Sequence, residues 1–141
     1  MSRVFWDTML LIYLLEGNPA YRPRADALLA RSRRRGDALF TSCLAVGEVM
    51  AGVERFEQPL KAVAARESLE EIGFRFLPFD PNAMRPFSLL RGREKLKVAD
   101  AVHLACAASA GIDLYLTGDL QLLRLDVPGV QFIADFNSSI L

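Results

Sequence analysis

The sequence predicts an α/β fold, a three-layer α/β/α sandwich around a five-stranded parallel sheet. Five short apolar segments, rich in aromatic and β-branched residues, alternate along the chain with segments of helical spacing. Acidic residues closely follow two of these strands, where parallel sheets bind their ligands. With 141 residues, of which 52% are hydrophobic and 24% charged, the chain fits one domain, residues 1–141, with one core.

The first half begins with a strand at Val4–Trp6, whose bulky residues lead into Asp7. The helix that follows, Met9–Leu15, is apolar on nearly every side, so part of its surface is expected to meet another chain. Gly17 ends this helix. Helical spacing, a glycine turn and a serine cap then predict a helix at 22–35, a strand at 38–41 and a helix at 43–55.

Prolines and glycines divide the second half of the chain. A helix restarts at Gln58-Pro59 and runs to about residue 71, because a first helical turn tolerates proline. Phenylalanines at 74, 76 and 79 mark the third strand, and Pro86 is expected to kink or split the next helix, at 82–90. The remaining predicted elements are a polar loop at 91–97, a helix at 99–110, a strand at 113–117, a short helix through 123 and a strand at 130–133.

Composition narrows the class of protein. Seventeen basic residues balance seventeen acidic ones, so any contact with nucleic acid must come from a local patch. No stretch approaches the ~20 apolar residues of a membrane-spanning helix, and no signal peptide is expected. Cys43 and Cys106 lie in separate apolar helical segments without the spacing of a zinc site. They are therefore expected to be reduced, buried thiols of a cytoplasmic protein.

Four acidic residues are not explained by an ordinary structural role. Glu48 is the most informative, because it lies inside a predicted helix with no cation three or four residues away. Asp7 and Asp119 follow strands and Asp100 opens a nearly apolar helix, so each alone could be a helix cap or a first-turn acid. As a group, they are expected to meet at the ligand-binding edge of the sheet.

Crowded carboxylates raise each other's pKa, and a divalent cation removes that cost. Ligands that are all oxygen, without cysteine or paired histidine, favour a hard ion such as Mg²⁺ or Mn²⁺. One or two such ions can activate a water and neutralise the charge that develops on a phosphate. The predicted chemistry is therefore metal-dependent hydrolysis of a phosphodiester.

Four short motifs in this order resemble those of PIN-domain ribonucleases, particularly the VapC-type toxins of toxin–antitoxin pairs. They are V-F-W-D-T at 4–8, S-C-L-A-V-G-E-V-M-A-G at 42–52, K-V-A-D-A-V-H-L-A at 97–105 and L-Y-L-T-G-D at 114–119. The resemblance covers the whole chain and implies a PIN-like fold, an RNA substrate, a cognate antitoxin and a homodimer. It also implies that Asp7, Glu48, Asp100 and Asp119 are catalytic metal ligands, with Thr8 and Thr117 in support.

Two positions depart from the pattern of that family. Met9 stands where members usually carry Asn or Ser, and Gln121 stands where some carry a further acid. These departures leave open a non-catalytic PIN-like module that binds RNA or protein through a degenerate site. An aspartyl phosphatase is a third possibility, but Met9 also occupies the position of the second aspartate that such phosphatases carry.

Basic residues and one histidine complete the set of candidates. Arg91, Arg93, Lys95 and Lys97 precede Asp100, and they either bind RNA phosphates or form an ordinary exposed loop. The arginine-rich run at 31–35 has the same two interpretations, since arginines also favour a helix end. His103 is either hydrogen-bonded in the core or part of the site.

Overall fold

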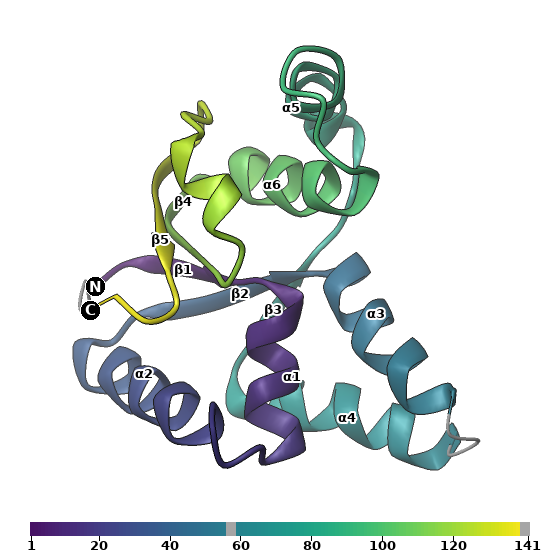
Figure 1. Ribbon diagram of the computed structural model, residues 1–141, viewed down its shortest axis with the longest axis vertical. Helices are drawn as coiled ribbons and strands as arrows, with labels where there is room; N and C mark the ends of the chain where they lie inside the picture. Colours follow the sequence, from purple (N-terminus) through teal and green to yellow (C-terminus); the bar gives the residue numbers. More distant parts are fainter. Residues whose placement is uncertain (56–58, 139–141) are drawn as a thin grey trace.

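The computed structural model describes residues 1–55 and 59–138, and its centre is a parallel sheet in the order β3-β2-β1-β4-β5 (Figure 1). The strands are β1 (Arg3–Trp6), β2 (Ala38–Ser42), β3 (Arg75–Leu77), β4 (Ile112–Thr117) and β5 (Val130–Asp135). Every neighbouring pair is parallel, and Val4 of the central strand lies between Leu39 and Leu114. The predicted five-stranded parallel sheet is confirmed.

Helices cover both faces of the sheet and complete the three layers, as Figure 1 shows. The first face packs against α1 (Thr8–Glu16), α2 (Arg22–Arg35), α3 (Cys43–Glu54) and α4 (Pro59–Ile72). The second packs against α5 (Pro81–Gly92), α6 (Val98–Ala110) and the short 3₁₀ helix η1 (Leu120–Arg124). Gln58, where the fourth helix was predicted to begin, lies outside the described residues.

The central strand β1 explains why bulky residues open the chain. Its side chains alternate between the two faces, with Trp6 in the α1–α4 core and Phe5 in the α5–α6 core. Phe5 stacks on Tyr115 of β4 at 4.7 Å between ring centroids, and Trp6 meets Phe74 edge-on at 5.4 Å. A strand buried on both faces holds the backbone at its carboxyl end, where Asp7 follows, in a fixed place.

Three sequence predictions need correction. Pro86 does not split helix α5, which extends to Gly92, so Arg91 is helical and the loop begins only at Arg93. Proline removes the backbone donor that would bond to the carbonyl of Asn82, but Asn82 is exposed and water can take that place. The third strand is only Arg75–Leu77, so Phe74 and Phe79 lie outside it.

Helix α1 buries most of its apolar surface within the chain itself. Leu10, Leu11 and Leu14 are buried in the first core, and Ile12, Tyr13 and Leu15 pack against it. Met9 is the exception, with 48% of its surface exposed. The apolar character of this helix therefore follows from its central position and carries no requirement for a second chain.

The two cysteines are both free thiols, and they differ in burial. Cys106 is buried and its Sγ donates to the carbonyl oxygen of Pro78 at 3.4 Å. Burial, with smaller contributions from Cys43 and Asp80, raises the pKa of the Cys106 thiol to about 11. Cys43 is exposed at the start of α3, so its predicted burial is wrong.

Within residues 1–55 and 59–138, none of the helices combines the length and the apolar character that crossing a bilayer demands.

Candidate active site

The four predicted acids line one pocket of about 320 Å³ at the carboxyl ends of β1 and β4. Asp7 follows β1, Asp119 follows β4, Asp100 lies in the first turn of α6, and Glu48 reaches the pocket from the middle of α3. Lys97, His103 and Tyr13 line the same pocket. The structure thus brings together side chains from four elements that lie far apart in the sequence.

Asp7 is held by a hydrogen bond to each carboxylate oxygen. Its Oδ1 accepts from the backbone N–H of Thr8 at 2.7 Å, which makes Asp7 the N-cap of α1. Its Oδ2 accepts from the hydroxyl of Thr117 at 2.8 Å. The Thr117 Oγ1 in turn accepts from the backbone N–H of Asp119 at 3.0 Å. Thr117, which is fully buried, therefore ties the two strand-end aspartates together.

Glu48 is held by a chain of hydrogen bonds that passes through His103. Ser42 Oγ caps α3 by accepting from the backbone N–H of Ala45 at 2.9 Å, so its own proton can point at His103 Nδ1, 2.7 Å away. His103 Nε2 then carries the ring proton and donates to Glu48 Oε1 at 2.9 Å. Thr8 Oγ1 donates to the same oxygen at 2.9 Å.

This chain of bonds decides between the two interpretations of His103. The ring is only 2% exposed, with both nitrogens in contact with polar groups, so it belongs to the core. It also lines the pocket and orients a site residue, so it belongs to the site as well. Both donors converge on Oε1 of Glu48, and among the described residues no donor reaches Oε2.

Asp100 is the acid with the least support. It is half-buried, and none of the residues that the structure describes donates a hydrogen bond to it. Burial raises the pKa of the Asp100 carboxyl, and the negative charges of Asp7 and Asp119 raise it further. His103 and Lys97 act in the opposite direction but less strongly. The pocket therefore concentrates negative charge that Lys97 and His103 offset only in part.

The donor set suits a hard divalent cation that keeps part of its water shell. Across residues 1–55 and 59–138, no three Asp, Glu, His or Cys side chains lie close enough together to coordinate one ion directly. Mg²⁺ seldom needs such a cage, because it usually retains several waters and binds through one or two carboxylates. Oδ2 of Asp119, Oε2 of Glu48 and both oxygens of Asp100 accept no hydrogen bond from a described residue.

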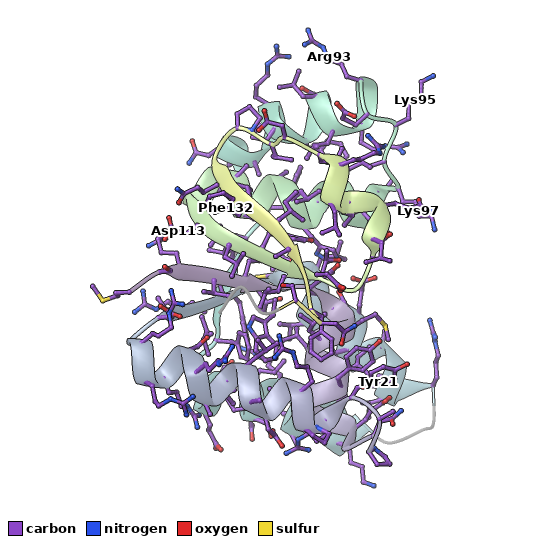
Figure 2. The ribbon with its side chains drawn as sticks, turned by 60° about the vertical axis from the view of Figure 1, so that its left-hand side comes forward. Tyr21, Arg93, Lys95, Lys97, Asp113 and Phe132 are labelled. Carbon is purple, nitrogen blue, oxygen red and sulfur yellow. The ribbon has the colours of Figure 1, made fainter. Side chains whose placement is uncertain are left out.

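The predicted basic residues do not act as one group. Lys97 lines the acid pocket, whereas Arg93 lines a separate cavity beside α5 and the turn before β5. Arg91 donates from Nη1 to the carbonyl oxygen of Leu96 at 2.7 Å, which closes the end of α5. Figure 2 shows Arg93 and Lys95 together at the far end of α5, with Lys97 apart from them. The arginine-rich run at 31–35 ends α2, away from the pocket lining.

Sequence reasoning did not single out Tyr13 and treated Ser42 only as a helix cap. Tyr13 lines the pocket beside Met9, and Ser42 starts the chain of bonds to Glu48. Helical spacing was the available signal for Tyr13, because it lies four residues after Met9 on the same face of α1. Of the two residues that depart from the family pattern, Met9 lines the pocket and Gln121 does not.

Comparison with known proteins gives one family and a consistent fold. The PIN domain family matches residues 4–128. The VapBC2 complex of Rickettsia felis bound to a promoter DNA fragment is similar over 94% of this chain and 97% of that chain, with 12% identity and a TM-score of 0.71. DNA-bound VapBC of Salmonella typhimurium is similar over 96% and 99%, with 20% identity and a TM-score of 0.74.

A toxin–antitoxin complex from Klebsiella pneumoniae shares 25% identity over 90% of this chain and 94% of that chain, with a TM-score of 0.66. No curated protein matches the sequence.

Proposed function

The chain belongs to the PIN domain family, and from this premise we propose that it is a Mg²⁺- or Mn²⁺-dependent endoribonuclease, the toxin of a type II toxin–antitoxin pair. One observation carries the proposal. Four carboxylates from separate elements line a single pocket, where burial, and then the charges of Asp7 and Asp119, raise the pKa of Asp100. Such repulsion is costly unless a divalent cation is bound.

Asp7, Glu48, Asp100 and Asp119 would hold one or two ions in this pocket. A bound ion of this kind supplies a water activated for attack and neutralises charge on the phosphate. The residues of the chain orient the ligands. Thr117 fixes Asp7, while Thr8 and His103 both donate to Oε1 of Glu48 and leave Oε2 available. This division of roles matches the need of metal ligands for supporting hydrogen bonds.

Several features support RNA as the substrate and a protein as the regulator. Lys97 offers a positive charge at the pocket, and a chain of zero net charge needs such a local contact to bind a phosphate.

The complexes that share this fold pair a toxin with an antitoxin, so a cognate antitoxin is proposed here too. Exposed Phe79 and Met84 support a homodimer, and two free thiols agree with the cytoplasm.

The direct test replaces Asp7 with Asn. Asparagine is an equally good N-cap, so α1 should keep its start, and the variant removes the charge together with the acceptor of the Thr117 hydroxyl. Cleavage of a single-stranded RNA in Mn²⁺ is expected to fall by more than about 100-fold, since metal ligation contributes several kcal/mol. The control is Asp126→Asn, an exposed aspartate outside the pocket, which should cleave like the wild type. Undiminished cleavage by Asp7→Asn would refute the proposal.

A second candidate is a non-catalytic PIN-like module that binds RNA or protein. The observation in its favour is Met9, which lines the pocket, is 48% exposed and offers no polar group to a metal-bound water. The two candidates differ in a simple assay at saturating Mn²⁺. RNA that is bound but remains intact would favour the module, and cleaved RNA would favour the nuclease.

A further inference from the structure

Two tyrosines form a stacked pair at the rim of the acid pocket. The ring centroids of Tyr13 and Tyr21 are 4.2 Å apart and the ring planes differ by 18°. Tyr13, on α1, lines the pocket with Asp7 and Asp119, and Tyr21 stands at the N-cap of α2. Tyr21 is 40% exposed, so this aromatic pair reaches from the pocket to the surface.

The pair is held firmly from the core outward. Tyr13 packs on Phe136, which is 2% exposed, with 5.4 Å between ring centroids. Below Tyr21, Gly17 ends α1 in the left-handed conformation at φ +74°, which favours glycine. Asn18 then accepts from the backbone N–H of Ala20 through its side chain and from that of Tyr21 through its carbonyl. The turn therefore presets the position of the Tyr21 ring.

The outer face of Tyr21 is what remains available. One face of its ring is covered by Tyr13, so its exposed surface belongs to the opposite face and the ring edge. Figure 2 shows Tyr21 and Lys97 on the same side of the molecule, with the exposed Phe132 on another side.

We propose that Tyr21, supported by Tyr13, is a stacking platform for one unpaired nucleobase of the RNA, next to the phosphate held at the acid pocket. The inference rests on the proposed function and adds to it the form of substrate, a single strand with an unstacked base. Every base has an aromatic face, so such a platform binds single strands with little preference for sequence. It would supply affinity that a chain of zero net charge lacks.

The alternative is that the tyrosine pair only joins α1 to α2. If Tyr21 stacks on a base, removing the ring and removing that base should weaken RNA binding through the same contact. If the ring only packs α1 against α2, the two changes should act independently. The probe is a fluorescein-labelled single-stranded RNA of eight nucleotides, compared with versions in which one position at a time is abasic. Fluorescence anisotropy in Mn²⁺, with phosphorothioate linkages that resist cleavage in every RNA, measures the dissociation constant for wild type and for Tyr21→Leu, which keeps an apolar side chain without an aromatic face.

We expect one abasic position to weaken binding to the wild type by about 5- to 150-fold, the range of a base stacked on an aromatic side chain. Tyr21→Leu should lose the same factor for the intact RNA and show no further loss for that abasic RNA. Tyr21→Phe should behave as the wild type. Phe132→Leu, which changes an exposed aromatic residue elsewhere, should also leave binding unchanged. Thermal melting of each variant checks that the α1–α2 turn still folds.

Other results would overturn the platform. Equal affinity of wild type and Tyr21→Leu for intact RNA, or equal weakening by Tyr21→Leu for intact and abasic RNA, would show that the ring serves packing or a protein contact. If the wild type still cleaves RNA in that case, the proposed nuclease stands and only the platform fails. A wild type that neither binds nor cleaves RNA would contradict both.

Discussion

The two ends of the sheet both carry aspartates, but their partners differ. At the amino ends of the strands, Asp37 accepts from the backbone N–H of Ser2 at 2.8 Å and lies 3.3 Å from Arg35 Nε, and Asp113 accepts from the backbone N–H of Arg3. The Asp37–Arg35 contact is an ion pair without the geometry of a hydrogen bond. At the carboxyl ends, Asp100 accepts no bond from a described residue and its pKa is raised.

This difference separates structural from functional carboxylates. Asp37 has a cation and a backbone donor, so its charge is already stabilised by the fold. In the pocket, Glu48 and Asp7 accept hydrogen bonds from uncharged threonine hydroxyls. The acids lie beside one another there, and Lys97 is the lysine that lines the pocket with them. Figure 2 shows the two ends on opposite sides, marked by Asp113 and Lys97. A carboxylate whose charge the fold leaves unbalanced is one that a ligand can balance.

The largest expected effect comes from exchanging one aspartate at each end. Asp100→Asn is expected to lower RNA cleavage by more than about 100-fold while leaving the fold intact, because the charge serves a metal ion. Asp37→Ala should instead keep its cleavage rate and lose about 1–3 kcal/mol of unfolding free energy, because it leaves a backbone donor and Arg35 without their acceptor. Initial cleavage rates measure the activity of each variant, and urea unfolding measures its stability. Similar losses of activity in both variants would contradict the difference between structural and functional carboxylates.

A smaller effect is expected from the hydroxyl that links two pocket acids. Thr117→Val keeps the β-branched shape of a buried strand residue but removes the donor to Asp7 and the acceptor for the Asp119 N–H. Loss of such a supporting bond typically weakens metal affinity by about 10- to 100-fold. Mn²⁺ affinity should fall by this factor, with cleavage at saturating Mn²⁺ less affected. Unchanged affinity would mean that Asp7 needs no such support.

His103 allows a finer distinction between packing and orientation. His103→Leu fills the same space without a donor, whereas His103→Gln can place an amide N–H near the position of Nε2. We expect the Leu variant to bind Mn²⁺ about 10-fold more weakly and the Gln variant to recover most of that loss. Equal behaviour of the two variants in Mn²⁺ titrations, with equal melting temperatures, would assign His103 to packing alone.

The smallest effect concerns the stability of the metal-free protein. A raised pKa means that the folded chain holds the Asp100 proton more tightly than the unfolded chain, whose pKa is near the ordinary 3.8. The ionised carboxylate therefore lowers stability as pH rises above 3.8. In EDTA at pH 7, Asp100→Asn should raise Tm by on the order of 1–3 °C, and the gain should shrink as pH falls toward 4. A gain that grows at lower pH would have the wrong sign.

Much of the fold was predictable because its signals are local. The bulky strand Val4–Trp6, the serine cap at Ser42 and the glycine after α6 each act within a few residues, and each predicted element is present. Element ends were less predictable. Helix α5 continues through Pro86 because the carbonyl that loses its donor, that of Asn82 in the first turn, is exposed to water. Sequence alone does not show that exposure.

The site was predictable where a strand end marked it and not where two distant segments meet. Asp7 and Asp119 could be placed from the strands before them. The contact of His103 with Glu48 joins residues 55 positions apart, and the spacing of apolar residues along the sequence does not predict such a contact. The Tyr13–Tyr21 stack likewise depends on how the turn after Gly17 returns the chain. The burial of Cys43 was mispredicted for a similar reason, because an apolar helix does not reveal which face its first residue occupies.

The most direct test of the account is a calorimetric titration with Mn²⁺ of the wild type, Asp100→Asn and Asp37→Ala. We expect the wild type and Asp37→Ala to bind the ion equally and Asp100→Asn to bind it at least about 10-fold more weakly, because Arg35 already balances the charge of Asp37, whereas no described residue forms an ion pair with Asp100. Wild-type protein that binds no Mn²⁺, or Asp100→Asn protein that binds it as tightly as the wild type, would contradict this.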